Sequence, residues 1–193
     1  MSHAAPVRRE LATRTVFNIL GPLTNPAGAT AQLIGVYAPE LVPLVANVLT
    51  LLGTERALVV HGAGGIDELS PAGPNLVHEV IDGAVRELVV DPLELGVPRC
   101  RPGDLAGGAP DENAAAIRAV FEGERGPKRD AILLNAAAAL FVAGSVADLA
   151  EGYAIASKVV DSGAAIARLE VLAAFTREAA MANAVTPQAG RVS

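Results

Sequence analysis

The chain has 193 residues, enough for one domain with a substantial core. Hydrophobic residues make up 51% of it and aromatic residues only 3%, so small aliphatic side chains must fill that core. The net charge is −6 and the Lys and Arg residues are dispersed, which argues against a nucleic-acid partner, because phosphate-backbone binding needs clustered cations. We therefore expect a small-molecule partner.

Cysteine usage and hydropathy indicate the cellular compartment. The single Cys100 leaves no disulfide framework within these residues and no second cysteine for a metal knuckle. We therefore expect a reducing, cytoplasmic location. No signal-like pattern opens the chain, and the Ala-rich stretch 135–143 falls short of the roughly 20 apolar residues that a membrane helix needs. No membrane association is expected.

The first part of the chain alternates helix and strand patterns. A short helix, or the end of a longer one, is predicted at 6–11, where a proline suits the first turn. An apolar strand is predicted at 31–38, a helix at 39–52 and a second strand at 56–61. A strand, helix, strand order with a crossover of this length indicates parallel pairing of the two strands.

The rest of the chain is predicted to form a hairpin and then helices. Residues 76–81 and 85–90 have strand patterns, and Asp82-Gly83 between them is a strong hairpin signal. Helical periodicity follows, in segments that begin at Asp111 and then cover 132–142, 146–160 and 164–183.

Two local patterns refine these helices, and together the elements define a fold class. Ser145 with Asp148 resembles a capping box at the start of the third helix, and the run 132–142 is apolar nearly all round, which indicates burial. The sum is an α/β domain over residues 1–183, with a mixed, largely parallel sheet flanked by helices. Residues 184–193 are expected to form a disordered tail.

Two adjacent carboxylates, Asp67 and Glu68, follow a glycine-rich turn at 61–65. On a regular strand they would point to opposite faces, but at a strand-to-loop transition both can converge on one cation. Magnesium favours such oxygen ligands and completes its shell with water and substrate phosphates. The alternative, which the spacing alone favours, is that Asp67 caps a turn and Glu68 is solvated.

Other polar residues are given structural roles. The glycines at 62–65 match neither the dinucleotide nor the Walker pattern, so we interpret them as a turn and His61 as a packed strand end. Asp111, Glu112 and Asn113 suit a helix start. Asn135, in a buried helix, must find hydrogen-bond partners.

Arg8 and Arg9 stand beside Glu10 near the start of the chain. A guanidinium group suits a planar carboxylate, because two parallel hydrogen bonds fix both its position and its orientation. Taken alone, however, the two arginines are interpreted as the solvated face of a helix.

Two runs carry a resemblance to a known family. The run 14–27 reads Arg-Thr-Val-Phe-Asn-Ile-Leu-Gly-Pro-Leu-Thr-Asn-Pro-Ala, and 65–70 reads Gly-Ile-Asp-Glu-Leu-Ser. Together they resemble the anthranilate phosphoribosyltransferase family. The likeness continues to about Glu178, through 111–114, 133–140 and 161–164. It implies a catalytic domain like those of nucleoside phosphorylases and phosphoribosyltransferases, without the N-terminal helical domain of the family.

The resemblance also implies a reaction and a set of site residues. The reaction transfers the phosphoribosyl group of 5-phosphoribosyl 1-pyrophosphate (PRPP) to anthranilate in tryptophan biosynthesis, and it needs no covalent nucleophile. We accordingly assign no catalytic residue. By resemblance Asp67 and Glu68 bind Mg²⁺, while Arg8 contacts anthranilate and Pro22 lines the same channel.

The family's three phosphate-binding loops precede the equivalent of Met1. We therefore expect a fragment, a misassigned start or half of a split enzyme, with little activity by itself. The family's homodimer contacts lie in the same upstream region, so these residues alone do not predict a dimer.

Two other functions stay open. One is a non-catalytic α/β remnant that binds a ligand or docks on a partner chain. The other is a pyrimidine nucleoside phosphorylase, although the run 18–25 together with Asp67 and Glu68 favours the anthranilate enzyme.

Overall fold

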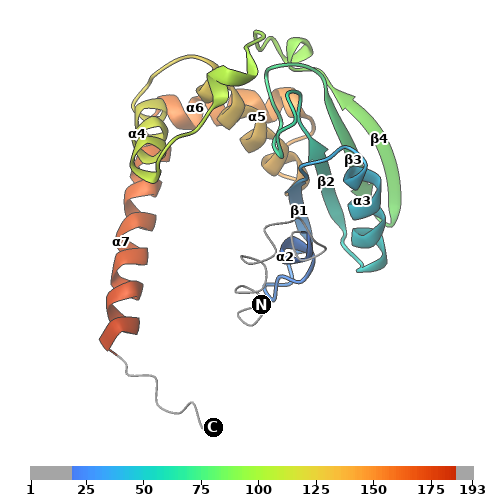
Figure 1. Cartoon of the computed structure of the whole chain (residues 1–193), viewed down its shortest axis with the longest axis horizontal. Coiled ribbons are helices and arrows are strands. Elements are labelled where there is room, and N and C mark those ends of the chain that lie inside the picture. Colours follow the sequence, from blue (N-terminus) through green and yellow to red (C-terminus); the bar gives the residue numbers. More distant parts are fainter. Residues whose placement is uncertain (1–18, 186–193) are drawn as a thin grey trace.

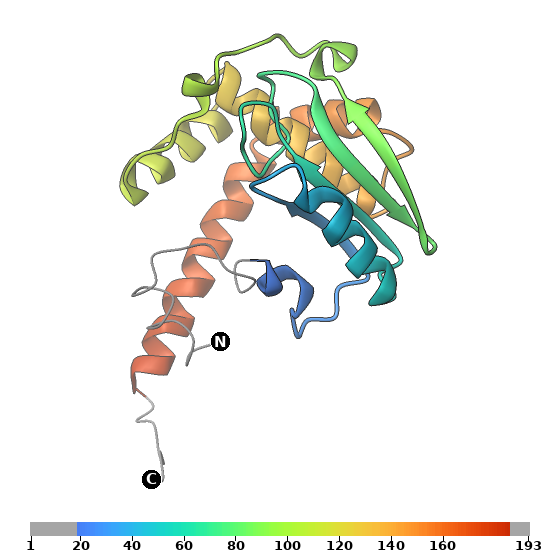
Figure 2. The same ribbon diagram turned by 45° about the vertical axis from the view of Figure 1, so that its right-hand side comes forward.

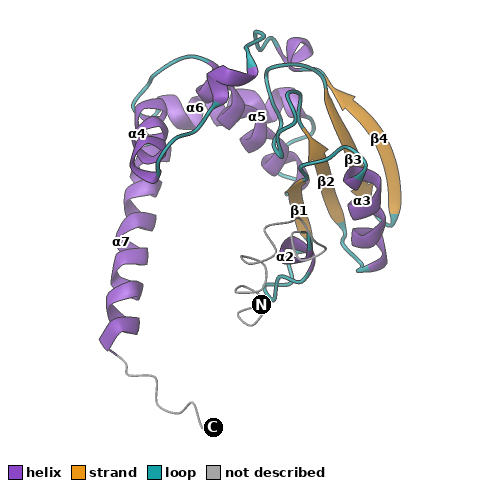
Figure 3. Ribbon diagram, in the orientation of Figure 1, coloured by secondary structure: helices purple, strands orange, loops and turns teal. Residues whose placement is uncertain are grey.

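The computed structural model describes residues 19–185. Helix α3 (Leu41–Leu51) covers one face of a central sheet, and α5 (Pro127–Val142), backed by α6 (Leu149–Asp161), covers the other (Figures 1 and 3). The helix expected at 6–11, Arg8 and residues 186–193 of the expected tail lie outside the described residues.

The sheet has four strands in the order β1-β2-β3-β4, which are Ala31–Gly35, Arg56–His61, Asn75–Ile81 and Ala84–Val90. Strands β1 and β2 pair in parallel, as expected, whereas β2 with β3 and β3 with β4 pair antiparallel. The α/β class with a mixed sheet is confirmed, but the parallel share is smaller than expected. Among the described strands only β1 and β2 are joined through a crossover helix, which parallel neighbours require.

Strand β2 is central, and its side chains alternate between two cores. Ala57 and Val59 pack with buried residues of α3, whereas Leu58 and Val60 pack with α5. Because successive strand residues point to opposite faces, a strand covered on both sides reads as an uninterrupted apolar run. This burial holds the carboxyl ends of β1 and β2 in a fixed place.

The hairpin turn falls where the sequence predicted it. Asp82 and Gly83 both have positive φ values, 49° and 80°. Positive φ at both central residues is the requirement of the type I′ turn, which matches the twist of paired strands. Strand β4 is mostly exposed and forms one edge of the described sheet.

The helical layer differs from expectation at two starts. Helix α5 begins at Pro127, five residues before the predicted 132, because proline is tolerated in a first turn whatever the hydropathy of that turn. Helix α6 is capped by Asp148, which accepts from the Glu151 N–H, while Glu151 accepts from the Ala147 N–H. The predicted start at Ser145 is therefore wrong, because Asp148 is the residue that caps the helix. A full capping box does not form there, since Glu151 bonds the N–H of Ala147 and not that of Asp148.

Helices α4 (Pro110–Phe121) and α7 (Ala164–Val185) complete the described layer, together with the short elements α2 (Leu20–Leu23), η3 (Pro92–Leu95) and η4 (Pro102–Leu105). Helix α7 contacts α4 and α6, and Arg118 forms an ion pair with Glu170. Beyond these contacts α7 extends away from the sheet (Figure 2). Its exposed large apolar side chains include Val171, Leu172, Phe175 and Met181.

Helix α7 ends two residues beyond the expected domain boundary at 183. The expectation of a disordered tail after it stays a prediction. Within residues 19–185, no helix combines the length and apolar character needed to cross a membrane.

Candidate functional site

The loop between β2 and β3, residues 62–74, carries Asp67 and Glu68 and is called the acidic loop here. It lies across the carboxyl ends of the two parallel strands. A Cβ atom placed on Gly35, the last residue of β1, would be 1.6 Å from the Asp67 carbonyl oxygen. A Cβ atom on Gly62, just after β2, would be 1.9 Å from the Glu68 carbonyl oxygen. Two glycines without side chains thus let the acidic loop approach the sheet.

The two carboxylates are exposed. No hydrogen bond or ion pair links either of them to another residue within 19–185, so the turn-capping alternative for Asp67 finds no supporting contact there. Groups of three or more His, Cys, Asp and Glu that could hold a metal ion are absent from the same part of the chain. The acidic pair by itself therefore offers two anionic ligands, the number that suits Mg²⁺ when water and substrate phosphates complete its shell.

A cavity of about 510 Å³ adjoins the acidic pair. Its wall includes the apolar side chains of Leu105, Ile117 and Ile132, and Lys128 contributes a cation. The residues come from η4, α4 and α5, so separate elements meet beside the carboxylates. One part of the cavity wall is formed by the two carboxylates and another part by apolar side chains. This combination suits a ligand that carries a metal-bound phosphate at one end and a less polar group at the other.

The glycine-rich turn before the carboxylates has the structural role that was predicted. Gly64 and Gly65 have φ values of 90° and 80°, which a residue with a side chain rarely adopts. The Nδ1 atom of His61 lies 2.9 Å from the Val36 carbonyl oxygen and so links the ends of the two parallel strands. This confirms His61 as a packed strand-end residue.

Asn135 is half-buried in α5 and has the hydrogen-bond partners that were expected of it. Its Oδ1 accepts from the Leu69 N–H at 2.9 Å, and its Nδ2 donates to the Leu69 carbonyl at 2.8 Å and to the Ala131 carbonyl at 2.9 Å. The expected structural role is confirmed. The sequence did not indicate the partner, which lies in the acidic loop 66 residues away.

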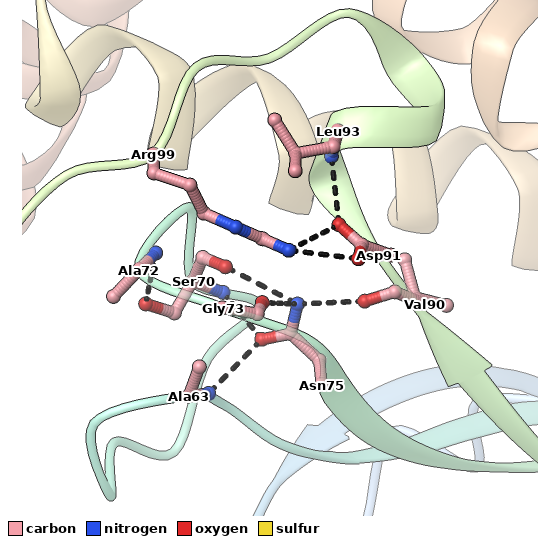
Figure 4. Close-up of polar contacts among 9 residues, drawn as sticks. All are labelled: Ala63, Ser70, Ala72, Gly73, Asn75, Val90, Asp91, Leu93 and Arg99. Carbon is pink, nitrogen blue, oxygen red and sulfur yellow. Dashed lines mark hydrogen bonds and ion pairs between the residues drawn. The ribbon is translucent and has the colours of Figure 1, made fainter.

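Asn75, the first residue of β3, was not singled out from the sequence, although it forms five hydrogen bonds (Figure 4). Its Oδ1 accepts from Ala63 and Ser70, and its Nδ2 donates to the carbonyls of Ser70, Gly73 and Val90. The only sequence signal was a polar residue at a strand start after proline, which many turns share. Asn75 ties the two ends of the acidic loop together.

Two further groups in this region are structural. Asp91 accepts from the Leu93 N–H at the start of η3 and pairs with Arg99 at 2.7 Å (Figure 4). The Leu93 hydrogen bond and the Arg99 guanidinium lower the pKa of Asp91. Burial, aided by the Asp104 carboxylate, raises the pKa of the Cys100 thiol, which disfavours a thiolate nucleophile.

Of the two predicted acceptor residues, only Pro22 lies within the described residues, and it does not share the cavity beside the acidic pair. Pro22 lies in α2 and lines a different cavity, of about 360 Å³, together with Thr30, just before β1, and Gln32 within it. Its role stays a prediction, as does that of Arg8, which lies outside the described residues. Asn113 bonds the Gly108 backbone at 2.9 and 3.0 Å, and Glu112 accepts from Ala109, so their helix-start role is confirmed.

Residues 1–166 match the family described as "Glycosyl transferase family, a/b domain", and the chain belongs to that family. The anthranilate phosphoribosyltransferase of Methylobacterium nodulans is 54% identical over 176 residues, which are 91% of this chain and 52% of that protein. The solved enzyme of the same name from Thermus thermophilus is 48% identical with a TM-score of 0.83, over 92% of this chain and 52% of that one.

A third relative has its ligands bound. Anthranilate phosphoribosyltransferase from Saccharomyces cerevisiae in complex with PRPP and Mg is 31% identical with a TM-score of 0.79, over 88% of this chain and 49% of that one. The resemblance found in the sequence is confirmed. The chain spans about half the length of these relatives and corresponds to their C-terminal part.

Proposed function

We propose that this chain provides the α/β part of an anthranilate phosphoribosyltransferase, which transfers the phosphoribosyl group from PRPP to anthranilate. The observation that carries the proposal is the acidic pair, Asp67 and Glu68, which is held at the carboxyl end of the parallel strands without a protein partner among the described residues. Membership of a glycosyl transferase family and the names of the relatives support it.

The reaction makes limited chemical demands on the protein. The anthranilate amine attacks C1 of the ribose, the bond from C1 to the pyrophosphate oxygen breaks, and the amine loses a proton. Positive charge develops on the sugar while negative charge develops on the departing pyrophosphate. The protein must align the two reactants and stabilise these charges, and no covalent intermediate is needed.

The acidic pair suits a magnesium ion that accompanies the pyrophosphate. Both carboxylates are exposed and free of described protein partners, so binding a cation breaks no existing ion pair. When bound, Mg²⁺ neutralises charge on the pyrophosphate. Asp67 and Glu68 would hold it through their side-chain oxygens, and substrate phosphates and water would supply the other ligands. The relative that is solved with PRPP and Mg supports Mg²⁺ as the metal.

The acceptor assignment rests on the resemblance. Arg8 would orient the anthranilate carboxylate through paired hydrogen bonds, and Pro22 would line the channel through which anthranilate enters. A cytoplasmic location, where the single Cys100 stays reduced, belongs to the same proposal. Homodimer formation, which the resemblance associates with the upstream region, stays a prediction.

The test uses a chimera that has the full length of a relative. A chimera joins the part of the Methylobacterium nodulans relative that precedes the region of similarity to these 193 residues. With anthranilate, PRPP and Mg²⁺, we expect turnover of roughly 1 per second or faster in the chimera, and little or none in the 193-residue polypeptide alone. A well-folded chimera that consumes no anthranilate would contradict the proposal.

A further inference from the structure

Three constraints meet at the two peptide groups next to the carboxylates. The Asp67 carbonyl oxygen lies against Gly35, and the Glu68 carbonyl oxygen lies against Gly62. The N–H of the peptide between Glu68 and Leu69 donates to Asn135 Oδ1 at 2.9 Å. Both ends of that one peptide plane are therefore fixed, its carbonyl by close packing and its N–H by a hydrogen bond.

A fixed peptide plane limits where the neighbouring side chain can point. Rotation of the peptide between Glu68 and Leu69 changes ψ of Glu68 and φ of Leu69, so fixing this plane restricts the backbone that carries the Glu68 side chain. The Asn135 amide also donates to the carbonyl of the same Leu69 at 2.8 Å. Because both backbone groups of Leu69 are bonded, the acidic loop cannot shift by one residue along Asn135 without losing both bonds. Its remaining amide hydrogen bonds the Ala131 carbonyl one turn earlier in α5, which locks the rotamer of Asn135.

Helix α5, which carries Asn135, is itself held firmly in the core. Helix α5 is buried between the sheet and α6 through Leu133 and Leu134, which are 2% and 1% exposed. Leu69, the residue that Asn135 holds, is 1% exposed. The Asn135 amide thus ties the backbone that immediately follows the two carboxylates to a helix of the core.

We propose that Asn135 is a positioning residue for the carboxylates of Asp67 and Glu68 and raises their affinity for a divalent cation. The inference rests on the proposed function, since it takes these carboxylates as the cation ligands. Two adjacent carboxylates repel each other, and a mobile loop would let them separate when no cation is bound. When the backbone is held in place, the free-energy cost of keeping the two carboxylates close together is met on folding. Less ordering of the loop is then needed when the cation binds.

The test measures Mn²⁺ binding to the 193-residue chain by electron paramagnetic resonance, which reports the free ion. Mn²⁺ stands in for Mg²⁺ because both prefer carboxylate and water oxygens. Asp67→Asn with Glu68→Gln defines the binding that belongs to other surface carboxylates. After subtraction of that background, Asn135→Ala and Asn135→Leu should each raise the Mn²⁺ dissociation constant about 10- to 100-fold, the usual cost of losing a residue that orients metal ligands.

Two controls separate positioning from general stability. Asn135→Leu replaces the amide with an apolar side chain of similar size, which fills the same space and leaves no cavity where Asn135→Ala would. Val45→Ala removes buried methyl groups from α3, in the core on the opposite face of the sheet, and lowers the melting temperature without touching the acidic loop. Its Mn²⁺ affinity should match that of the unmodified chain.

The outcomes are distinct. If the unmodified chain binds Mn²⁺ through the acidic pair and both Asn135 variants bind it equally well, the positioning inference is overturned while the proposed metal site stands. An equal loss of affinity in Val45→Ala would also overturn it, because loss of stability alone would then explain the effect. If the unmodified chain binds no more Mn²⁺ than Asp67→Asn with Glu68→Gln, the metal site fails and the inference fails with it.

Discussion

The contact between Gly35 and the acidic loop makes a strong prediction for Gly35→Ala. A Cβ atom at this position would lie 1.6 Å from the Asp67 carbonyl oxygen and 2.5 Å from its carbonyl carbon. Real Cβ atoms keep at least 3.0 Å from such neighbours, and the neighbour here is backbone rather than a flexible side-chain tip. The acidic loop must therefore move outward by about 1.4 Å, the difference between 3.0 and 1.6 Å.

The expected effects follow from the size of this displacement. Overpacking of this kind costs about 1 to 3 kcal/mol of stability. A misplacement of about 1 Å in a catalytic arrangement can lower the rate roughly 100-fold. In the completed chimera we expect a Mg²⁺-dependent rate about 100-fold lower for Gly35→Ala, with the urea midpoint lowered in proportion to the stability lost.

Gly103→Ala is the matched control. A Cβ atom on Gly103 would meet nothing within 4 Å, and its backbone needs no positive φ value. Stability and rate should therefore stay within the range of ordinary surface substitutions, about 0.5 kcal/mol. The reasoning is refuted if Gly35→Ala behaves like Gly103→Ala in both assays, because the acidic loop would then be free to adapt.

Three further predictions concern other parts of the chain. Arg86→Ala should lower the free energy of unfolding in urea by about 1 to 3 kcal/mol, because it leaves the 4% exposed Glu79 without its partner at 2.6 Å. Arg99→Ala is the control, and it should lower that free energy by no more than Arg86→Ala does. Burial raises the pKa of Tyr153 from 10.0 to about 12, so its contribution to stability is complete below pH 10 and is lost as pH rises towards 12. Urea unfolding at several pH values should show this loss, and a Tyr153→Phe variant should not show it. In the chimera, Arg8→Ala should raise the anthranilate KM roughly 10- to 100-fold without a similar change for PRPP, and equal effects in Arg9→Ala would contradict the assignment.

Elements with a strong local signal were predictable from the sequence. The strand at 56–61 coincides with β2, because its four central residues, 57–60, are all buried and apolar. The Asp82-Gly83 turn was fixed by residues that tolerate positive φ. The start of α5 was missed because its first turn, from Pro127 to Asp130, is polar although it is helical.

The candidate site was only partly predictable. Two adjacent carboxylates after a glycine-rich turn drew attention to Asp67 and Glu68 by their chemistry. Nothing local showed that Gly35 would lie against one of them, or that Asn135 would bond the residue after the other, since these contacts join distant parts of the chain. Asn135 was expected to need partners, but a burial argument cannot name them.

The most direct test of the account is the Mg²⁺ dependence of the rate in the chimera, compared between the unmodified protein and Asp67→Asn with Glu68→Gln. Both substitutions preserve side-chain size and remove the anionic oxygens that a hard cation prefers. The account predicts that the double variant loses most of its activity and needs a higher Mg²⁺ concentration for what remains. An unchanged rate with an unchanged Mg²⁺ dependence would contradict the claim that the acidic pair binds the metal.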